Sequence, residues 1–198
     1  MRGLSYFIVK PVKSRYKNIK KIGDKSLITN TENFTHQNVN RNAIVLATPK
    51  DFETKIKVGD EVIVHHNVFR RWKDVRGIEK NSKGYFKENQ YFVQQDQIYL
   101  YKHNNKWESV DDYCFVKPIH SFSKFDIEHE QPLMGILKYT NNHKFLKDLN
   151  IGDLVGFTPN SEYEFIINKE KLYRVLTKAI TIKYEYQGKE KEYNPSWV

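Results

Sequence analysis

Hydrophobic and polar residues alternate along much of the chain. In the segment 178–186, Ile180, Ile182 and Tyr184 fall on one face of an extended chain, and the residues between them fall on the other. Alternation with a period of two indicates a β-strand with one buried face. Further short segments rich in β-branched and aromatic residues are bounded by turn-forming residues. They lie at 6–9, 43–47, 61–66, 91–102, 113–116, 135–139, 153–157 and 163–167. No segment of helix length shows a helical period, so the pattern predicts an all-β protein.

The strand segments recur in the same order in the two halves of the chain. Four blocks match, at offsets of 107, 92, 93 and 82 residues. The matching residues are Lys10 with Lys117, Val45 with Leu137, Gly59 with Gly152, and Ile98 with Ile180. Four matches in one order are hard to obtain by chance, so the repeat predicts two tandem domains, residues 1–110 and 111–198. Short strands at this spacing are typical of small β-barrels or sandwiches, and we expect two small barrels.

A Gly-Asp pair stands directly before a strand in each half, at Gly59-Asp60 and at Gly152-Asp153. Glycine adopts a positive φ without steric cost, and aspartate accepts hydrogen bonds from nearby backbone amides. The pairs therefore predict tight turns that begin a strand. A catalytic or metal-binding role for these aspartates is not favoured, because neither motif holds a second acid or a histidine at ligand spacing.

The composition of the chain excludes several classes of protein but does not identify a function. The 198 residues include 39% hydrophobic residues, enough for a folded core, and carry a net charge of +9. This charge suits a nucleic acid or another acidic partner, but a lysine-rich solvated surface is the favoured interpretation. No apolar run is long enough to span a membrane, residues 1–13 do not resemble a signal peptide, and Cys114 has no cysteine to pair with. We therefore expect a cytoplasmic protein without a membrane partner.

The sequence contains no recognisable catalytic motif. It lacks a nucleophile elbow, a phosphate-binding loop and a Cys-x-x-Cys pair. Cys114 lies inside a predicted strand and is expected to pack as a small hydrophobic residue. We accordingly expect no enzymatic activity, no cofactor and no metal ion.

The repeated blocks resemble strands of the GroES-type co-chaperonins. The most specific block is 56–67, which is similar to the Val-Lys-Val-Gly-Asp-x-Val strand of that family. The segments 6–12, 41–49 and 91–102 are similar to other strands of the family, and the same features recur in residues 111–198. The tandem form resembles phage-encoded members. This resemblance implies GroES-like barrels, a ring of identical subunits and a GroEL-type chaperonin as the partner.

In that family, a mobile loop between the first two strands carries an apolar tripeptide that docks on the chaperonin. The corresponding segment here is 13–41, which is long and polar. Its best match to the tripeptide is Leu27, Ile28 and Thr29, although the family's Gly-Gly pair is absent and Thr29 replaces an apolar residue. The alternative is that Leu27 and Ile28 form a small edge strand that covers the barrel. The second half is about 15 residues shorter here, so only the first domain has room for such a loop.

A basic and aromatic segment follows within residues 65–88. The candidate contact residues are Phe69, Arg70, Arg71, Trp72, Lys73 and Arg76. Aromatic rings that stack on bases, combined with cations that hold phosphates, are typical of single-stranded nucleic-acid binding. The favoured alternative is a hairpin whose tryptophan packs on the barrel while its arginines face water.

Together these features predict a non-enzymatic co-chaperonin that caps a chaperonin ring and assists protein folding. The main alternative is a phage virion or assembly component that uses the same barrel as a structural module, because a fold does not determine a function. A basic nucleic-acid-binding protein is the third possibility.

Overall fold

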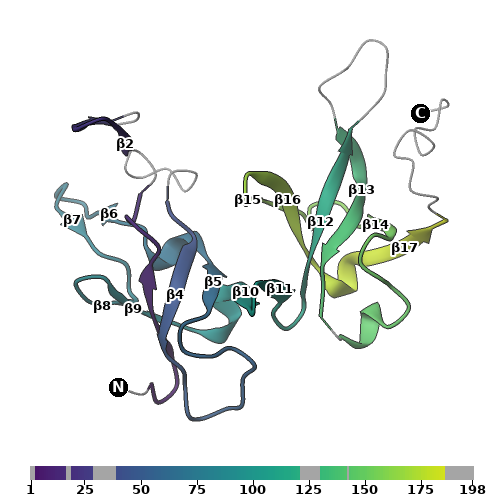
Figure 1. Ribbon diagram of the computed structural model, residues 1–198, viewed down its shortest axis with the longest axis horizontal. Coiled ribbons are helices and arrows are strands. Elements are labelled where there is room, and N and C mark those ends of the chain that lie inside the picture. The colour runs from purple at the N-terminus through teal and green to yellow at the C-terminus, as the bar shows by residue number, and fades with distance from the viewer. Residues whose placement is uncertain (1–2, 17–18, 29–38, 121–129, 142, 186–198) are drawn as a thin grey trace. The chain divides into compact units, whose positions relative to one another are not determined.

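The computed structural model describes residues 3–16, 19–28, 39–120, 130–141 and 143–185. The described residues form several antiparallel β-sheets and four single-turn 3₁₀ helices, and they include no α-helix (Figure 1). The predicted all-β class is therefore confirmed. Chain contacts divide the protein into two compact units, residues 1–107 (unit 1) and 108–198 (unit 2). No helix in the described part of the chain has the length and apolar character needed to cross a bilayer.

Unit 1 is built on a seven-stranded sheet. One strand at the edge of this sheet, β11 (Lys106–Ser109), has residues on both sides of the boundary between the units. In order, the strands of the sheet are β11, β10 (Ile98–His103), β5 (Glu61–Val64), β4 (Asn42–Ala47), β1 (Phe7–Pro11), β9 (Gln90–Val93) and β8 (Tyr85–Lys87). Two separate two-stranded sheets consist of β2 (Ile19–Ile22) with β3 (Lys25–Ile28), and β6 (Trp72–Lys73) with β7 (Glu79–Lys80). The 3₁₀ helices are η1 (His66–Val68) and η2 (Gln95–Gln97).

Unit 2 is built on a six-stranded sheet. In sheet order its strands are β15 (Tyr163–Ile167), β16 (Glu170–Leu176), β12 (Tyr113–His120), β13 (Glu130–Tyr139), β14 (Leu154–Phe157) and β17 (Ile180–Tyr184). The 3₁₀ helices η3 (Lys144–Leu146) and η4 (Thr177–Ala179) lie between strands. The order reproduces that of unit 1 from β8 to β10, strand for strand.

The pairing register repeats as well as the strand order. Val9 faces Val45 between β1 and β4, and Val116 faces Leu137 between β12 and β13, as the offsets of 107 and 92 residues require. Both pairings contain an irregularity immediately before that valine. The β5–β10 and β14–β17 pairings also match, with a register shift at the same place. The sequence repeat is therefore a structural repeat.

The two Gly-Asp pairs form the same turn, as predicted. Gly59 has φ +94° and Gly152 has φ +99°, a region that favours glycine. The carboxylates of Asp60 and Asp153 each accept a hydrogen bond from the amide three residues upstream, at 2.8 Å in both units. Each turn therefore fixes the start of the strand that follows.

Two details of the predicted architecture are not borne out. Neither large sheet closes on itself within the described residues, because β11 and β8, and likewise β15 and β17, are end strands with a neighbour on one side only. A closed barrel would need those ends to pair. In β17, Ile182 is 48% exposed although its spacing predicted a buried face, since this strand lies at a sheet edge.

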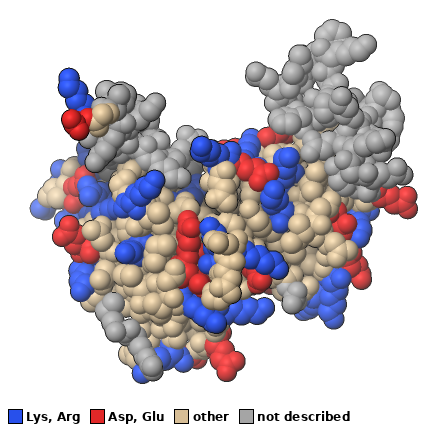
Figure 2. Space-filling model, viewed as in Figure 1, with Lys and Arg blue, Asp and Glu red and all other residues tan. Residues whose placement is uncertain are grey.

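Charge is divided unequally between the units. Residues 1–107 contain 21 Lys and Arg against 10 Asp and Glu, a net charge of +11, whereas residues 108–198 contain 12 against 14, a net charge of −2. Figure 2 shows basic and acidic side chains interspersed on one face, so the excess does not form a single block there.

Candidate functional site

Unit 1 differs from unit 2 by two longer connections. The offset between matching strands falls from 107 for β1 to 92 for β4, which gives unit 1 about 15 more residues between these strands. It falls again from 93 for β5 to 82 for β9, which gives unit 1 about 11 more residues there. We call these connections the long loop (residues 12–41) and the long hairpin segment (residues 65–89). They contain both sites that the sequence singled out.

The two ends of the long loop are held together at its base. The side-chain amide of Asn40, only 4% exposed, donates to the carbonyl oxygens of Val12 at 2.6 Å and Ser14 at 2.9 Å. Tyr16 and Val39 form a β-bridge one residue further along. The residues nearest the sheet at both ends of the loop are therefore part of the folded unit.

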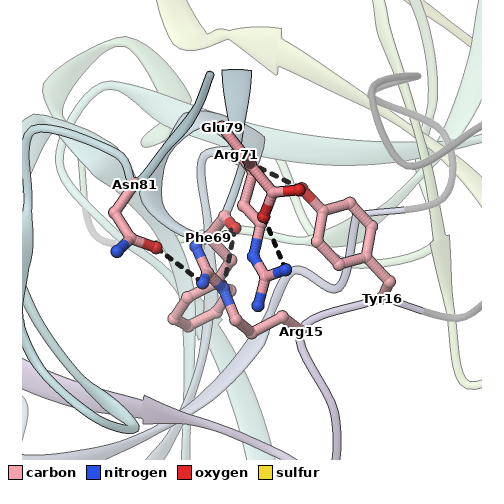
Figure 3. A network of polar contacts seen from close by, with 6 residues as sticks. All are labelled: Arg15, Tyr16, Phe69, Arg71, Glu79 and Asn81. Carbon is pink, nitrogen blue, oxygen red and sulfur yellow. Dashed lines mark hydrogen bonds and ion pairs between the residues drawn. The ribbon is translucent and has the colours of Figure 1, made fainter. Parts of the chain in front are cut away.

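Arg15 connects this base to the long hairpin segment. Its guanidinium donates through Nε at 3.2 Å and Nη2 at 2.9 Å to the carbonyl oxygen of Phe69, and through Nη1 at 2.8 Å to Oδ1 of Asn81 (Figure 3). The same guanidinium lies over the ring of Tyr91, 5.2 Å from its centroid. Arginine suits this position because its planar fork donates in several fixed directions and stacks on an aromatic ring.

Tyr16 makes a second connection beside the first. Its hydroxyl accepts a hydrogen bond of 2.7 Å from the backbone N–H of Arg71, and Nη1 of Arg71 lies 2.6 Å from Oε1 of Glu79 (Figure 3). Tyr16 is 8% exposed. The two insertions of unit 1 are therefore bonded to each other through neighbouring residues of the loop base.

Burial alters the acid–base properties of the two groups that stack in this network. It lowers the pKa of Arg15 below its ordinary value, and it raises the pKa of Tyr91. Arginine normally titrates so far above neutrality that the guanidinium keeps its charge at neutral pH, and the tyrosine stays protonated. The network is thus a structural junction with a fixed positive charge.

The docking residues expected from the sequence belong to a small sheet and not to the junction. Leu27 and Ile28 are the last two residues of β3, where they pair with Lys20 and Ile19 of β2 across the turn at Gly23. Thr29 lies outside the described residues. The structure thus gives Leu27 and Ile28 a strand backbone within a two-stranded sheet that is separate from the large one.

The six candidate residues of the long hairpin segment do not form one contact surface. Phe69 is fully buried and packs edge-to-face on Tyr91 at 4.9 Å, so it belongs to the core. Arg71 is paired with Glu79, and Arg70 is partly buried. Trp72, Lys73 and Arg76 remain exposed. Trp72 is 49% exposed and donates a hydrogen bond from Nε1 to the carbonyl oxygen of Asn81, whereas the buried Phe69 anchors this segment in the core.

The tip of this segment presents apolar side chains that the sequence analysis overlooked. Val75 is fully exposed and Ile78 is 51% exposed. Oδ1 of Asp74 accepts hydrogen bonds of 2.9 Å from the amides of Arg76 and Ile78, and Gly77 has φ +77°. The Asp-x-x-Gly spacing of a tight turn was the signal available for this feature.

Two side chains that could carry chemistry, Cys114 and Asp60, lie in different units. Cys114 in β12 is fully buried, as predicted, and burial raises the pKa of its thiol to about 12, so no thiolate forms near neutrality. Oδ1 of Asp60 lies 2.8 Å from Nδ1 of His103, a partner that the motif itself did not reveal. Within the described residues, no three His, Cys, Asp or Glu side chains gather closely enough to hold a metal ion.

Comparison with known proteins gives no relationship that would assign this site, because no family model matches the chain and no curated protein matches it.

Proposed function

We propose that the protein is a non-enzymatic co-chaperonin built from two GroES-like units, which caps a GroEL-type chaperonin as a ring of subunits. Leu27 and Ile28 are the docking pair. The observation that carries the proposal is the long loop: the two units share one strand order, yet only unit 1 has a long β1–β4 connection whose base is fixed to the fold.

The fixed base favours docking through the loop. Ordering a residue's backbone costs roughly 1–2 kcal/mol, so a segment already bonded at both ends adds less to the cost of binding. The Asn40 and Arg15 contacts supply those bonds. Burying one Leu or Ile side chain contributes about 1.5–3 kcal/mol, so a single loop binds weakly. A ring presents several loops at once, and their effective concentration makes the complex stable.

The test is capping of a chaperonin. The full-length chain is mixed with a GroEL-type chaperonin and ATP, and capped rings are counted by electron microscopy. Leu27→Ser combined with Ile28→Ser should abolish capping while the circular dichroism spectrum remains that of the original protein. The matched control is Val75→Ser with Ile78→Ser, which removes two apolar residues from another exposed turn and should leave capping intact. Normal capping by the first variant would refute this docking pair.

The virion or assembly component remains the second candidate, because of the rigid turn at the tip of the long hairpin segment. Val75 and Ile78 are displayed on a backbone that Asp74 fixes, an arrangement suited to a lasting protein interface. In the capping experiment this candidate predicts no capped rings with the original protein.

A further inference from the structure

The outer face of β1, β9 and β8 carries a row of aromatic rings. The ring of Phe92 lies 6.2 Å from that of Tyr6 and 4.9 Å from that of Phe86. Tyr6 is 42% exposed and Phe86 is 45% exposed, while Phe92 between them is partly buried. Aromatic rings of this size are usually covered, so a row exposed on a sheet is a candidate contact surface.

Strand pairing places the three rings on one face. Ile8 of β1 is directly opposite Phe92 of β9, and Phe86 follows Tyr85, whose ring packs on Tyr91 on the other face. The chain reaches β8 through Gly84, where an added Cβ would lie 2.5 Å from the carbonyl oxygen of Phe92. The glycine therefore allows β8 to approach closely enough for the rings of Phe86 and Phe92 to touch.

Lysines flank the row. Nζ of Lys87 lies 5.6 Å from the ring centroid of Phe86, and Lys10 is exposed in β1, two residues beyond Ile8. An open cavity of about 430 Å³ lies at the C-terminal end of β1. It is lined by Lys10, Pro11, Val12, Lys13, Ile44 and Asn89. Aromatic rings therefore lie near the start of β1, and a cavity lined by two lysines lies at its end.

In unit 2, a side chain of the same unit lies over the corresponding aromatic rings. At the offsets of the repeat, Tyr113 corresponds to Tyr6 and Arg174 corresponds to Phe92. The guanidinium of Arg174 lies 5.0 Å from the ring centroid of Tyr113 and 5.4 Å from that of Tyr163. Unit 2 therefore covers its own aromatic rings with a cation, whereas unit 1 leaves the equivalent rings exposed beside lysines.

We propose that this outer face, formed by Tyr6, Phe86, Phe92, Lys10, Lys13 and Lys87, binds single-stranded nucleic acid. Exposed aromatic rings stack on unpaired bases, and neighbouring lysines neutralise phosphates. The net charge of +11 in residues 1–107 complements such a polyanion, whereas unit 2 has no excess of positive charge. A single strand is favoured over a duplex because its bases are free to reach rings that lie on a sheet.

This face contains none of the six candidate contact residues that the sequence analysis considered for nucleic acid. Phe69 and Arg71 of that segment are engaged within the fold, whereas Tyr6 and Phe86 keep exposed ring surface. The inference goes beyond the proposed function and does not depend on it, because its test involves no chaperonin.

The first experiment measures stacking. A fluorescein-labelled oligothymidylate is titrated with the full-length protein near physiological salt, and binding is followed by fluorescence anisotropy. Tyr6→Ala combined with Phe86→Ala should weaken binding at least about tenfold, given that stacking on one aromatic ring is worth about 1–3 kcal/mol. The matched control is Phe145→Ala, because this ring of unit 2 is 58% exposed and lies 5.1 Å from Nζ of Lys144. This control should bind like the original protein.

The second experiment measures the neutralisation of phosphates. Lys10→Gln combined with Lys87→Gln should weaken binding and reduce the slope of log K against log salt, by about 0.7 for each phosphate that the variant no longer neutralises. Lys144→Gln is the control and should leave the slope unchanged. Circular dichroism of every variant distinguishes a weakened binding face from an unfolded protein.

Three outcomes would overturn the proposal. One is an absence of binding to the oligothymidylate by the original protein. Another is equally strong binding of inorganic polyphosphate, which has charge but no bases, together with indifference to the aromatic substitutions. The third is preferential binding to phosphatidylserine vesicles, which would assign the same face to a membrane surface.

Discussion

Units 1 and 2 share a strand order and a pairing register, but they carry different residues at several of the shared positions. Phe7 of β1 and Cys114 of β12 occupy equivalent, fully buried places, and Phe92 of β9 corresponds to Arg174 of β16. The Gly-Asp turns, by contrast, are nearly identical in geometry. The comparison shows that the Gly-Asp turns, which fix the backbone, are kept in both units. The size of the core side chains and the chemical type of the surface side chains differ between them.

The long loop and the long hairpin segment are a second difference between the units. Both additional lengths of chain in unit 1 lie between strands that keep their pairing, and the two insertions bond to each other through Arg15 and Tyr16. The equivalent connections of unit 2 are shorter. The shared sheet therefore serves as the framework, and the features that distinguish unit 1 were added at its connections.

The largest expected effect concerns the shared core position. Phe7→Ala should lower the free energy of unfolding of unit 1 by about 3–5 kcal/mol, because it leaves a large cavity. Cys114→Ala removes one heavy atom and should cost unit 2 only about 1 kcal/mol. Urea denaturation followed by hydrogen exchange and mass spectrometry reports each unit separately in the full-length chain. Equal losses in the two variants would show that the positions are not comparable in packing.

The junction between the insertions should give the next largest effect. Arg15→Ala leaves the buried carbonyl of Phe69 without these two hydrogen bonds and should destabilise unit 1 by about 1–3 kcal/mol. Exchange should accelerate at the amides of residues 13–16 and 69–71 and remain unchanged in unit 2. Arg15→Lys is the control, because it keeps the charge but loses the planar fork, and it should recover little of the stability. Full recovery would mean that charge alone holds the junction.

The turns should respond alike in both units. Gly59→Ala and Gly152→Ala introduce a Cβ where φ is near +95° and no heavy atom lies within 4 Å, so only backbone strain is added. Each should cost its own unit about 1–2 kcal/mol. Asn105→Gly and Asn160→Gly, at φ values of +63° and +59°, are controls that relieve rather than add strain. A difference between the two alanine variants well beyond experimental error would refute the equivalence of the turns.

Much of the framework could be predicted from the sequence, because its signals are local. Alternating residues revealed the strands, and Gly59-Asp60 and Gly152-Asp153 revealed the turns and the repeat. The junction could not be predicted, since Arg15 and Phe69 are 54 residues apart and only tertiary contacts bring them together. Sheet closure and the exposure of Ile182 likewise depend on which strands end the sheet, and alternation carries no information on this point.

The aromatic face escaped the sequence analysis for a related reason. Tyr6 and Lys10 share a strand face by their spacing, but Phe86 and Phe92 join them only through the pairing of β8, β9 and β1. In the sequence, clustered arginines in residues 70–76 gave a stronger signal of nucleic-acid binding. The fold places Arg71 in an ion pair, which shows why clustering along the chain is a poor guide to a surface.

The smallest expected effect is a pH dependence of unit 2 that comes from the turn aspartate Asp153. Burial alone would raise the pKa of Asp153, but the hydrogen bond from the Asn150 amide and the ammonium group of Lys183, 2.7 Å away, outweigh it and hold the pKa below its ordinary value. A carboxylate with a depressed pKa in the folded state stabilises that state above its unfolded pKa, near 3.9, and this contribution is lost as the pH falls through the folded value.

Unit 2 should therefore lose stability as the pH is lowered below about 4, and Asp153→Asn should reduce this pH dependence while leaving unit 1 unchanged. The measurement is the urea midpoint of each unit by hydrogen exchange at several acidic pH values. Glu162→Gln, which removes an exposed carboxylate of unit 2, controls for the general effect of charge and should leave the slope close to that of the original protein. Tyr101 holds the position of Lys183 in unit 1, so the lysine partner is specific to unit 2, and the side-chain partner of Asp60 is His103 instead. An unchanged acid profile in Asp153→Asn would show that the Lys183 ion pair contributes no folding free energy.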